Sequence, residues 1–257
     1  MDLRLQGKRA VVTGGTRGIG RAIAEALAAE GCNIALCARD AAEVLEAIGA
    51  LQAKGVQASG VVVDVADGEA LRAWIRQVGE EPGGIEILFS NPAGGWGGMT
   101  PQDWKANFDV DVMGAVNASQ AAMPYLERAA AEKGGAAIVA TASASALIVG
   151  IGGLSYGAMK AALIHLAKGL AHDGAPKHVR ANTVSPGMVY FPGGIWNWVE
   201  QNAPEQFQAM FAMNPMGRMA TPQEVAAAAV FLASPVSAFT SGANLVIDGA
   251  ATDRVNY

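Results

Sequence analysis

Short apolar runs alternate with segments of helical periodicity along the whole chain, and this alternation limits the possible folds more than any other feature. The runs that predict strands lie at 9–13, 33–38, 56–63, 85–89, 136–141, 179–184 and 244–247. The segments that predict helices lie at 19–30, 41–54, 67–78, 100–131, 155–172 and 221–233. Such alternation produces right-handed crossovers and a parallel sheet. No change of composition and no linker divides the chain, so we predict one α/β domain over residues 1–257.

Two of these helices have clear start signals. Thr100-Pro101 and Thr221-Pro222 each place a threonine N-cap before a proline at the first helical position, with an acid at the third. Between the last predicted strands, residues 188–219 form an insertion rich in aromatic side chains and methionine. We expect this insertion to be a lid over a substrate pocket, and a helix pair packed on the core is the alternative.

The chain has no charged side chain between Lys133 and Lys160, a stretch long enough to cross a bilayer. Six glycines and several hydroxyl residues interrupt it, which favours a buried strand followed by a loop. The N-terminus lacks the apolar core of a secretory signal, and the net charge of −5 leaves no basic excess for nucleic acid. We therefore expect a cytoplasmic protein with neither a membrane nor a nucleic-acid partner, in which Cys32 and Cys37 are buried.

A glycine-rich turn with the sequence TGGTRGIG joins the first predicted strand to the first predicted helix at residues 13–20. Glycines there let the backbone approach a pyrophosphate, which the free N–H groups of the helix then bind. The turn therefore indicates a dinucleotide site. A tight connection between strand and helix without a ligand is the alternative reading.

The end of the second predicted strand indicates which dinucleotide is bound. Chains that bind NAD carry a carboxylate there for the ribose 2′-hydroxyl, whereas this chain has Arg39, with Arg17 available from the glycine turn. Two guanidinium groups suit a 2′-phosphate, so NADP(H) is favoured over NAD(H). Asp40 is the competing acid if the strand is longer. Asp64, after the third strand, either accepts from the adenine amino group or caps a loop.

Tyr156 and Lys160 lie four residues apart, which places a phenol and an ammonium group on one helix face. A neighbouring positive charge lowers the pKa of a phenol and so makes it a usable acid or base near neutrality. Ser143 follows the preceding strand and can reach the same pocket, where its hydroxyl can hydrogen-bond a substrate oxygen. These three side chains predict an acid/base site that acts on a substrate oxygen.

With these motifs the chain resembles the short-chain dehydrogenase/reductase family, and its layout is similar to that of the 3-oxoacyl carrier-protein reductases. The resemblance extends over nearly the whole length through the TGGTRGIG turn, Asp64-Val65, Ser143, Tyr156, Lys160, Ser185-Pro186-Gly187, Ser241-Gly242 and Asp248-Gly249. It implies a doubly wound, Rossmann-like sheet of seven parallel strands within three αβα layers. It also implies hydride transfer between a nicotinamide and a carbonyl or alcohol carbon, and assembly into a homotetramer or homodimer.

The resemblance assigns roles to individual residues. Tyr156 would be the general acid/base, Ser143 would polarise the substrate oxygen, and Lys160 would hold the nicotinamide ribose and lower the tyrosine pKa. Val189 would offer its backbone to the carboxamide. The complete set predicted to bind the cofactor is Gly14, Thr16, Arg17, Gly18, Ile19, Gly20, Arg39, Asp64, Val65, Asn91, Pro92, Ala93, Tyr156, Lys160, Pro186, Gly187 and Val189.

Three departures from the family pattern lie in this site. Ser90-Asn91-Pro92-Ala93 replaces the usual Asn-Asn-Ala-Gly, so that a backbone donor is lost and the glycine is displaced by one residue. Phe191 stands where a threonine would hydrogen-bond the cofactor. Asp111 aligns with the family's fourth catalytic residue, an asparagine. We hypothesise that a charged Asp111 partly neutralises Lys160 and weakens its effect on Tyr156.

The substrate side is predicted to be apolar and aromatic. The residues that we expect around the substrate are Trp96, Ser145, Tyr190, Phe191, Trp196 and Trp198. This set favours a bulky apolar ketone or secondary alcohol. A carrier-protein thioester is the alternative substrate, although residues 190–216 carry no basic side chain to receive it. A second alternative is a catalytically impaired binding or scaffold protein.

Two other kinds of active site have no support in the sequence. His165, His172 and His178 have no partner constellation around a serine, so a serine hydrolase is not predicted. Neither H-E-x-x-H nor paired C-x-x-C occurs, so no metal site is predicted.

Overall fold

Seven parallel strands form one sheet in the computed structural model, which describes residues 2–150 and 152–253. The strands are β1 (Arg9–Thr13), β2 (Asn33–Ala38), β3 (Ala58–Val62), β4 (Ile87–Ser90), β5 (Ala136–Thr141), β6 (Val179–Pro186) and β7 (Asn244–Ile247). Their order in the sheet is β3-β2-β1-β4-β5-β6-β7. The order reverses between β1 and β4, and ligands of such sheets bind in the crevice outside the carboxyl ends of the strands at this point.

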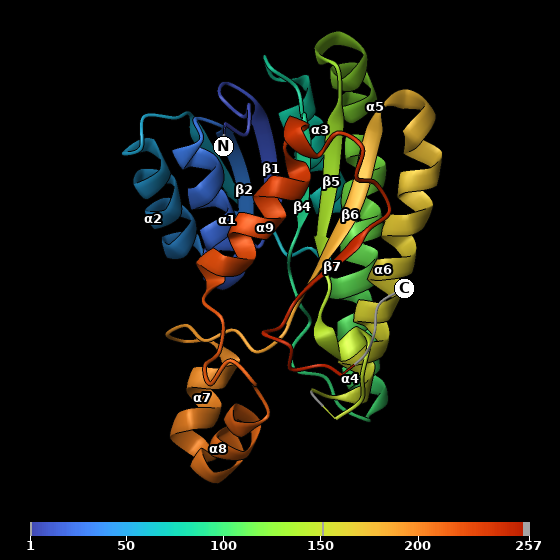
Figure 1. Ribbon diagram of the computed structural model, residues 1–257. Helices are drawn as coiled ribbons and strands as arrows, with labels where there is room; N and C mark the ends of the chain where they lie inside the picture. Colours follow the sequence, from blue (N-terminus) through green and yellow to red (C-terminus); the bar gives the residue numbers. More distant parts are fainter. Residues whose placement is uncertain (1, 151, 254–257) are drawn as a thin grey trace.

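Helices cover both faces of the sheet (Figure 1). On one face, α1 (Gly18–Ala29), α2 (Ala41–Gln52) and α9 (Pro222–Ala233) enclose an apolar core. On the other face, α3 (Gly68–Glu80), α5 (Gly114–Lys133) and α6 (Leu154–Gly174) enclose a second one. The predicted Rossmann-like αβα architecture in a single domain is therefore confirmed.

The uncharged stretch after Lys133 contains a central strand, as expected from its composition. All six residues of β5 are buried between β4 and β6. A single 3-10 turn (Ala144–Ala146) follows, and α6 then begins at Leu154. Within the described part of the chain, no helix combines the length and the apolar character that a membrane crossing needs.

The long helix predicted for residues 100–131 is present, but its middle is π-helical, which was not predicted. The chain forms α4 (Pro101–Asn107), then a π-helical segment (Phe108–Met113), and then α5. A π-helical turn adds a residue to the helical circuit and changes which side chains face inward. Here it carries Asp111, whose side chain is buried against Lys160 and Gly94. Periodicity alone did not reveal this interruption, because its partners lie on other elements.

The insertion at 188–219 forms a helix pair, α7 (Ile195–Asn202) and α8 (Pro204–Ala212), beyond the carboxyl ends of the strands (Figure 1). The pair has a small apolar core of its own, built from Met188, Trp196, Val199, Phe207 and Met219. Trp96 and Ile148 from the sheet-edge loops pack against this core. The pair therefore lies at the edge of the sheet where the crevice opens.

Both cysteines are buried, which leads to a chemical prediction. Burial raises the pKa of the Cys32 and Cys37 thiols to about 12. We expect neither thiol of the native protein to react with a disulfide reagent at about pH 8, because thiolate and access are both lacking. Both should react after unfolding. The control is Leu45→Cys on the exposed face of α2, and a native thiol labelled as fast as Cys at position 45 would contradict the prediction.

Candidate active site

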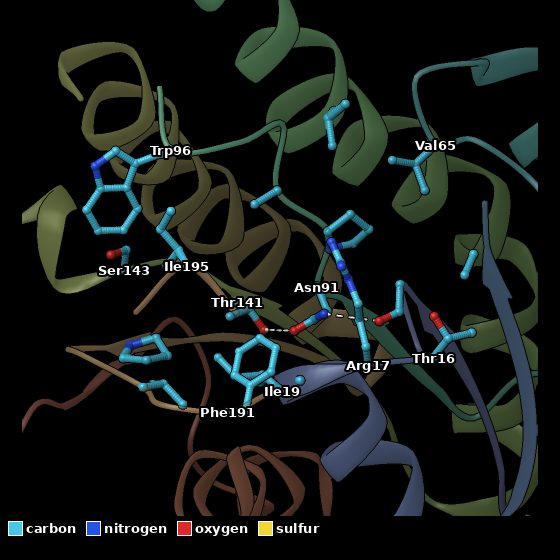
Figure 2. Close-up of a pocket in the computed structure, with 18 of the residues that line it drawn as sticks. Thr16, Arg17, Ile19, Val65, Asn91, Trp96, Thr141, Ser143, Phe191 and Ile195 are labelled. Carbon is cyan, nitrogen blue, oxygen red and sulfur yellow. Dashed lines mark hydrogen bonds between the residues drawn. The ribbon is translucent and has the colours of Figure 1, made fainter. Parts of the chain in front are cut away.

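A cavity of about 460 Å³ occupies the crevice at the switch point of the sheet (Figure 2). Its walls come from the glycine turn after β1 and from the ends of β2, β4, β5 and β6. Of the predicted cofactor and catalytic residues, those that line it are Gly14, Thr16, Arg17, Gly18, Ile19, Arg39, Asp64, Val65, Asn91, Pro92, Ala93, Ser143, Tyr156, Lys160, Pro186, Gly187 and Val189. The fold thus gathers segments from most of the chain into one site.

The glycine turn is built so that only glycine fits at two of its positions. Gly18 has a φ of +54°, in the left-handed region that favours glycine. A Cβ on Gly20 would lie 2.0 Å from the Gly14 carbonyl oxygen. Among the described residues no side chain caps the N-terminus of α1. The uncapped backbone N–H groups at the start of α1 face the cavity beside Arg17, so the turn fits the pyrophosphate of a dinucleotide.

The two acids considered as cofactor ligands, Asp40 and Asp64, both line the cavity, and both have structural partners. Asp40 caps α2, and its side chain accepts a hydrogen bond of 2.9 Å from the Glu43 backbone N–H. Asp64 accepts from the Ala66 N–H at 3.0 Å, as the loop-cap alternative predicted, while still lining the cavity. Arg17 and Arg39 both line the cavity, and Figure 2 shows the Arg17 side chain extended across it.

Asn91 joins three strands at the floor of the cavity. Its Nδ2 donates to the Gly14 carbonyl oxygen at 3.3 Å, and its Oδ1 accepts from the Thr141 hydroxyl at 3.1 Å. Figure 2 shows both hydrogen bonds. The ring of Pro92 packs against Gly14, where an added Cβ would lie 3.1 Å from it. The proline thus closes the wall by packing, although it has no N–H to donate.

The three residues predicted to carry the chemistry converge. Ser143 follows β5, and its hydroxyl donates to the Ser145 hydroxyl at 3.2 Å and accepts from the Ser145 N–H at 3.1 Å. Lys160 Nζ lies 5.6 Å from the centroid of the Tyr156 ring. Ser143, Tyr156 and Lys160 all line the cavity, which brings a hydroxyl, a phenol and an ammonium group into one site.

Lys160 has a buried ionic partner. Its Nζ lies 2.8 Å from Asp111 Oδ1, and the two side chains are 1% and 0% exposed. The lysine also donates to the carbonyl oxygens of Thr141, at 2.9 Å, and Pro92, at 3.4 Å. Asp111 therefore acts on the lysine through its carboxylate, as our hypothesis of partial neutralisation requires.

Some of the predicted substrate residues line the cavity and others do not. Trp96, Ser145, Phe191 and Trp196 line it, together with Ile195, which the sequence analysis did not identify. Tyr190 and Trp198 lie elsewhere. The Tyr190 hydroxyl binds Glu200 and Asn197 in the helix pair. Trp198 is 57% exposed, because helical periodicity turns it away from the buried positions Trp196 and Val199.

Phe191 lies over the glycine turn. Its ring would meet a Cβ on Gly18 at 2.6 Å, and one on Gly194 at 2.9 Å. It therefore packs between the turn and the start of α7, in the place where the family has a hydrogen-bonding threonine.

Comparison with known proteins supports the resemblance. A family profile described as enoyl-(acyl carrier protein) reductase matches residues 14–252. Over 248 residues the chain is 33% identical to the isoepoxydon dehydrogenase patN of Penicillium expansum, with 95% of each chain covered. The chain belongs to the short-chain dehydrogenase/reductase family. It is therefore an NAD(P)-dependent oxidoreductase.

Solved structures of this family have the same fold. L-sorbose reductase from Gluconobacter frateurii, complexed with NADPH and L-sorbose, is 31% identical with a TM-score of 0.90, over 99% of this chain and 100% of that chain. A 7α-hydroxysteroid dehydrogenase complexed with NADH and 7-oxo glycochenodeoxycholic acid is 29% identical with a TM-score of 0.88, over 99% and 98%. The family thus includes enzymes with either nicotinamide cofactor.

The buried ion pair of this dehydrogenase/reductase leads to a stability prediction. Asp111→Ala should lower the free energy of unfolding by about 3–5 kcal/mol, because it leaves a buried ammonium without its counterion. Adding Lys160→Met should recover part of that loss, since both charges are then gone. Urea denaturation of the two single variants and the double variant measures the coupling.

The same helical region offers a matched control. Asp109 pairs with Lys105, whose side chain is 75% exposed. Asp109→Ala should therefore cost less than about 1 kcal/mol. Equal losses for Asp109→Ala and Asp111→Ala would show that the buried pair has no special weight.

Proposed function

We propose that the cavity transfers a hydride between NADP(H) and a bulky apolar ketone or secondary alcohol, with Tyr156 as general acid/base. The observation that carries this proposal is the convergence of Ser143, Tyr156 and Lys160 between a dinucleotide-binding turn and an aromatic wall. When bound, the cofactor would supply or receive the hydride at its nicotinamide ring. The protein's own groups would hold it, bind the substrate and move the proton.

Different residues would bind the pyrophosphate and the 2′-phosphate of the cofactor. The open N-terminus of α1 would hold the pyrophosphate, and the guanidinium groups of Arg17 and Arg39 would bind the 2′-phosphate. One oxygen of the Asp40 carboxylate, which also lines the cavity, is used to cap α2. These placements favour NADP(H) over NAD(H).

The catalytic residues would act on the substrate oxygen. In reduction, the Tyr156 hydroxyl gives its proton to the carbonyl oxygen, and Ser143 donates a hydrogen bond to the same oxygen. The Lys160 ammonium group stabilises the phenolate that remains. In alcohol oxidation the proton moves the opposite way, from the hydroxyl to the phenolate. The buried Asp111 carboxylate reduces the net positive charge that the phenolate experiences.

The walls of the cavity suggest the substrate class. Trp96, Ile195 and Trp196 give the cavity an apolar wall near Tyr156, and Phe191 lines it over the glycine turn. We infer that α7 and α8 form a lid over this end, since their apolar core includes Trp196 and contacts Trp96. A homotetramer or homodimer remains a prediction of the family resemblance.

The role of Tyr156 can be tested by removing one oxygen atom. Tyr156→Phe should lower kcat for ketone reduction roughly 10²- to 10⁴-fold, because it removes the transferable proton and keeps the ring. Tyr190→Phe is the matched control, since the Tyr190 hydroxyl binds Glu200 outside the cavity. Undiminished activity of Tyr156→Phe would refute the proposal. If the wild type fails to turn over any ketone or alcohol with either cofactor, the scaffold alternative is favoured.

Cofactor preference can be tested separately. Arg17→Ala and Arg39→Ala should each raise KM for NADPH roughly tenfold, because each removes a charged hydrogen-bond donor from the phosphate. KM for NADH should change little. Arg76→Ala, on the exposed face of α3, controls for a general loss of positive charge. A wild type that prefers NADH would contradict the arginine assignment.

A further inference from the structure

The loop between β4 and α4 is anchored by an unusual set of buried polar side chains. Asn107, Asp111, Ser155 and Lys160 are each no more than 1% exposed. Each of them makes a direct hydrogen bond to the backbone of residues 92–98. Burying four polar side chains is costly unless they are hydrogen-bonded, and a buried hydrogen-bonded network of this kind holds the loop in one position.

Asp111 is the centre of this network. Its Oδ2 accepts hydrogen bonds from the Gly94 N–H, at 2.9 Å, and from Asn107 Nδ2, at 3.1 Å. Its Oδ1 faces Lys160 Nζ at 2.8 Å. The lysine donates its aligned hydrogen bonds to the carbonyl oxygens of Thr141 and Pro92. Its contact with Asp111 Oδ1 is an ion pair without an aligned hydrogen bond.

This geometry explains why the position holds an acid. All three neighbours of the carboxylate, Gly94 N–H, Asn107 Nδ2 and Lys160 Nζ, are donors. An asparagine has one acceptor oxygen and one NH₂ group, so its NH₂ would face donors on one side or the other. The two departures from the family pattern are therefore linked, because the carboxylate of Asp111 accepts the hydrogen bond that the N–H of the displaced glycine, Gly94, donates.

The other anchors hold the far end of the loop. Ser155 accepts from the Gly98 N–H at 3.0 Å and donates to Asn107 Oδ1 at 2.9 Å. Asn107 Nδ2 also donates to the Gly95 carbonyl oxygen at 3.4 Å. The Gly153 N–H donates to the Trp96 carbonyl oxygen at 2.9 Å. The loop is thus held from Pro92 to Gly98.

The loop presents Trp96 to the active site. The Trp96 ring stacks on the Tyr156 ring, with centroids 6.2 Å apart and planes 16° apart. The Trp96 ring also meets the Trp196 ring of α7 edge-to-face, with centroids 5.3 Å apart and planes at 88°. Figure 2 shows Trp96 near Ser143 and Ile195 in the cavity. The indole is therefore a fixed wall beside the groups that would handle the substrate oxygen.

We propose that Trp96 determines specificity for ring-bearing ketones, and that Asp111 is a positioning residue that aligns Trp96 by tying its loop to Lys160. The proposal rests on the proposed function for its substrate. It gives Asp111 a second role besides its effect on the lysine charge, and one that acts at a distance from the substrate. A flat ring beside the reacting carbonyl would pack against the indole face, whereas a short alkyl chain would gain little from it.

The test compares kcat/KM for acetophenone with kcat/KM for 2-butanone. Trp96→Ala should lower the ratio of the two values about tenfold, and Trp96→Phe should keep most of it. Asp111→Asn should lower the ratio about three- to tenfold, although Asp111 does not line the cavity. Ser155→Ala should act in the same direction, because it releases Gly98 without touching Lys160.

A double variant separates the two roles of Asp111. In the Trp96→Ala background, Asp111→Asn should leave the ratio unchanged, because the wall that it aligns is already gone. If Asp111 acts through Lys160 alone, Asp111→Asn lowers kcat/KM equally for both ketones and leaves the ratio at the wild-type value. That result would overturn the positioning role.

Amide hydrogen exchange provides a readout that does not depend on activity. The Gly94 and Gly98 amides should exchange faster in Asp111→Asn and Ser155→Ala than in the wild type, with the sheet unchanged. Unchanged protection in both variants would overturn the anchoring. Should Asp111→Asn fail to fold, as judged by circular dichroism, Ser155→Ala decides the question. A wild type inactive on every ketone would contradict both the proposed function and the specificity role of Trp96. The hydrogen-exchange measurement would still test whether Asp111 and Ser155 anchor the loop.

Discussion

A buried ammonium group must be compensated, and the active site of this protein is organised around that requirement. Lys160 has almost no contact with water, so its charge would be strongly destabilising without a counterion. Asp111 supplies the opposite charge, and the carbonyl oxygens of Thr141 and Pro92 accept hydrogen bonds from the Lys160 ammonium group. The lysine thus links α6 to the π-helical segment, to the end of β5 and to the loop after β4.

Two of the three departures from the family pattern, at residues 90–94 and at Asp111, form one physical unit around this lysine. Pro92 loses an N–H and offers its carbonyl oxygen to Lys160. The glycine displaced along the chain, Gly94, donates to the carboxylate that replaces an amide. Taken singly, each change removes a feature of the family motif. Together they form connected contacts, because Gly94 and Asp111 hydrogen-bond each other and Lys160 contacts both Pro92 and Asp111.

The topology of the sheet decides which residues can meet there. Because parallel strands place all their carboxyl ends on one edge, the glycine turn after β1, Asn91 after β4 and Ser143 after β5 reach the same crevice. The helix pair α7 and α8 lies at that edge, with Trp196 turned into the cavity. The polar end and the aromatic end of the site are thereby parts of one cavity.

The sequence by itself determined the fold class through its periodicity, and its motifs identified the family and predicted the glycine turn and the group of Ser143, Tyr156 and Lys160. Only the tertiary structure decided the rest. The π-helical segment, the acceptor role of Asp111 and the anchoring by Asn107 and Ser155 depend on partners far away in the chain. Tyr190 and Trp198 were placed at the pocket by composition, and packing turned them elsewhere. Local patterns report which face of an element is apolar, whereas hydrogen bonds between elements exist only once the sheet has brought those elements together.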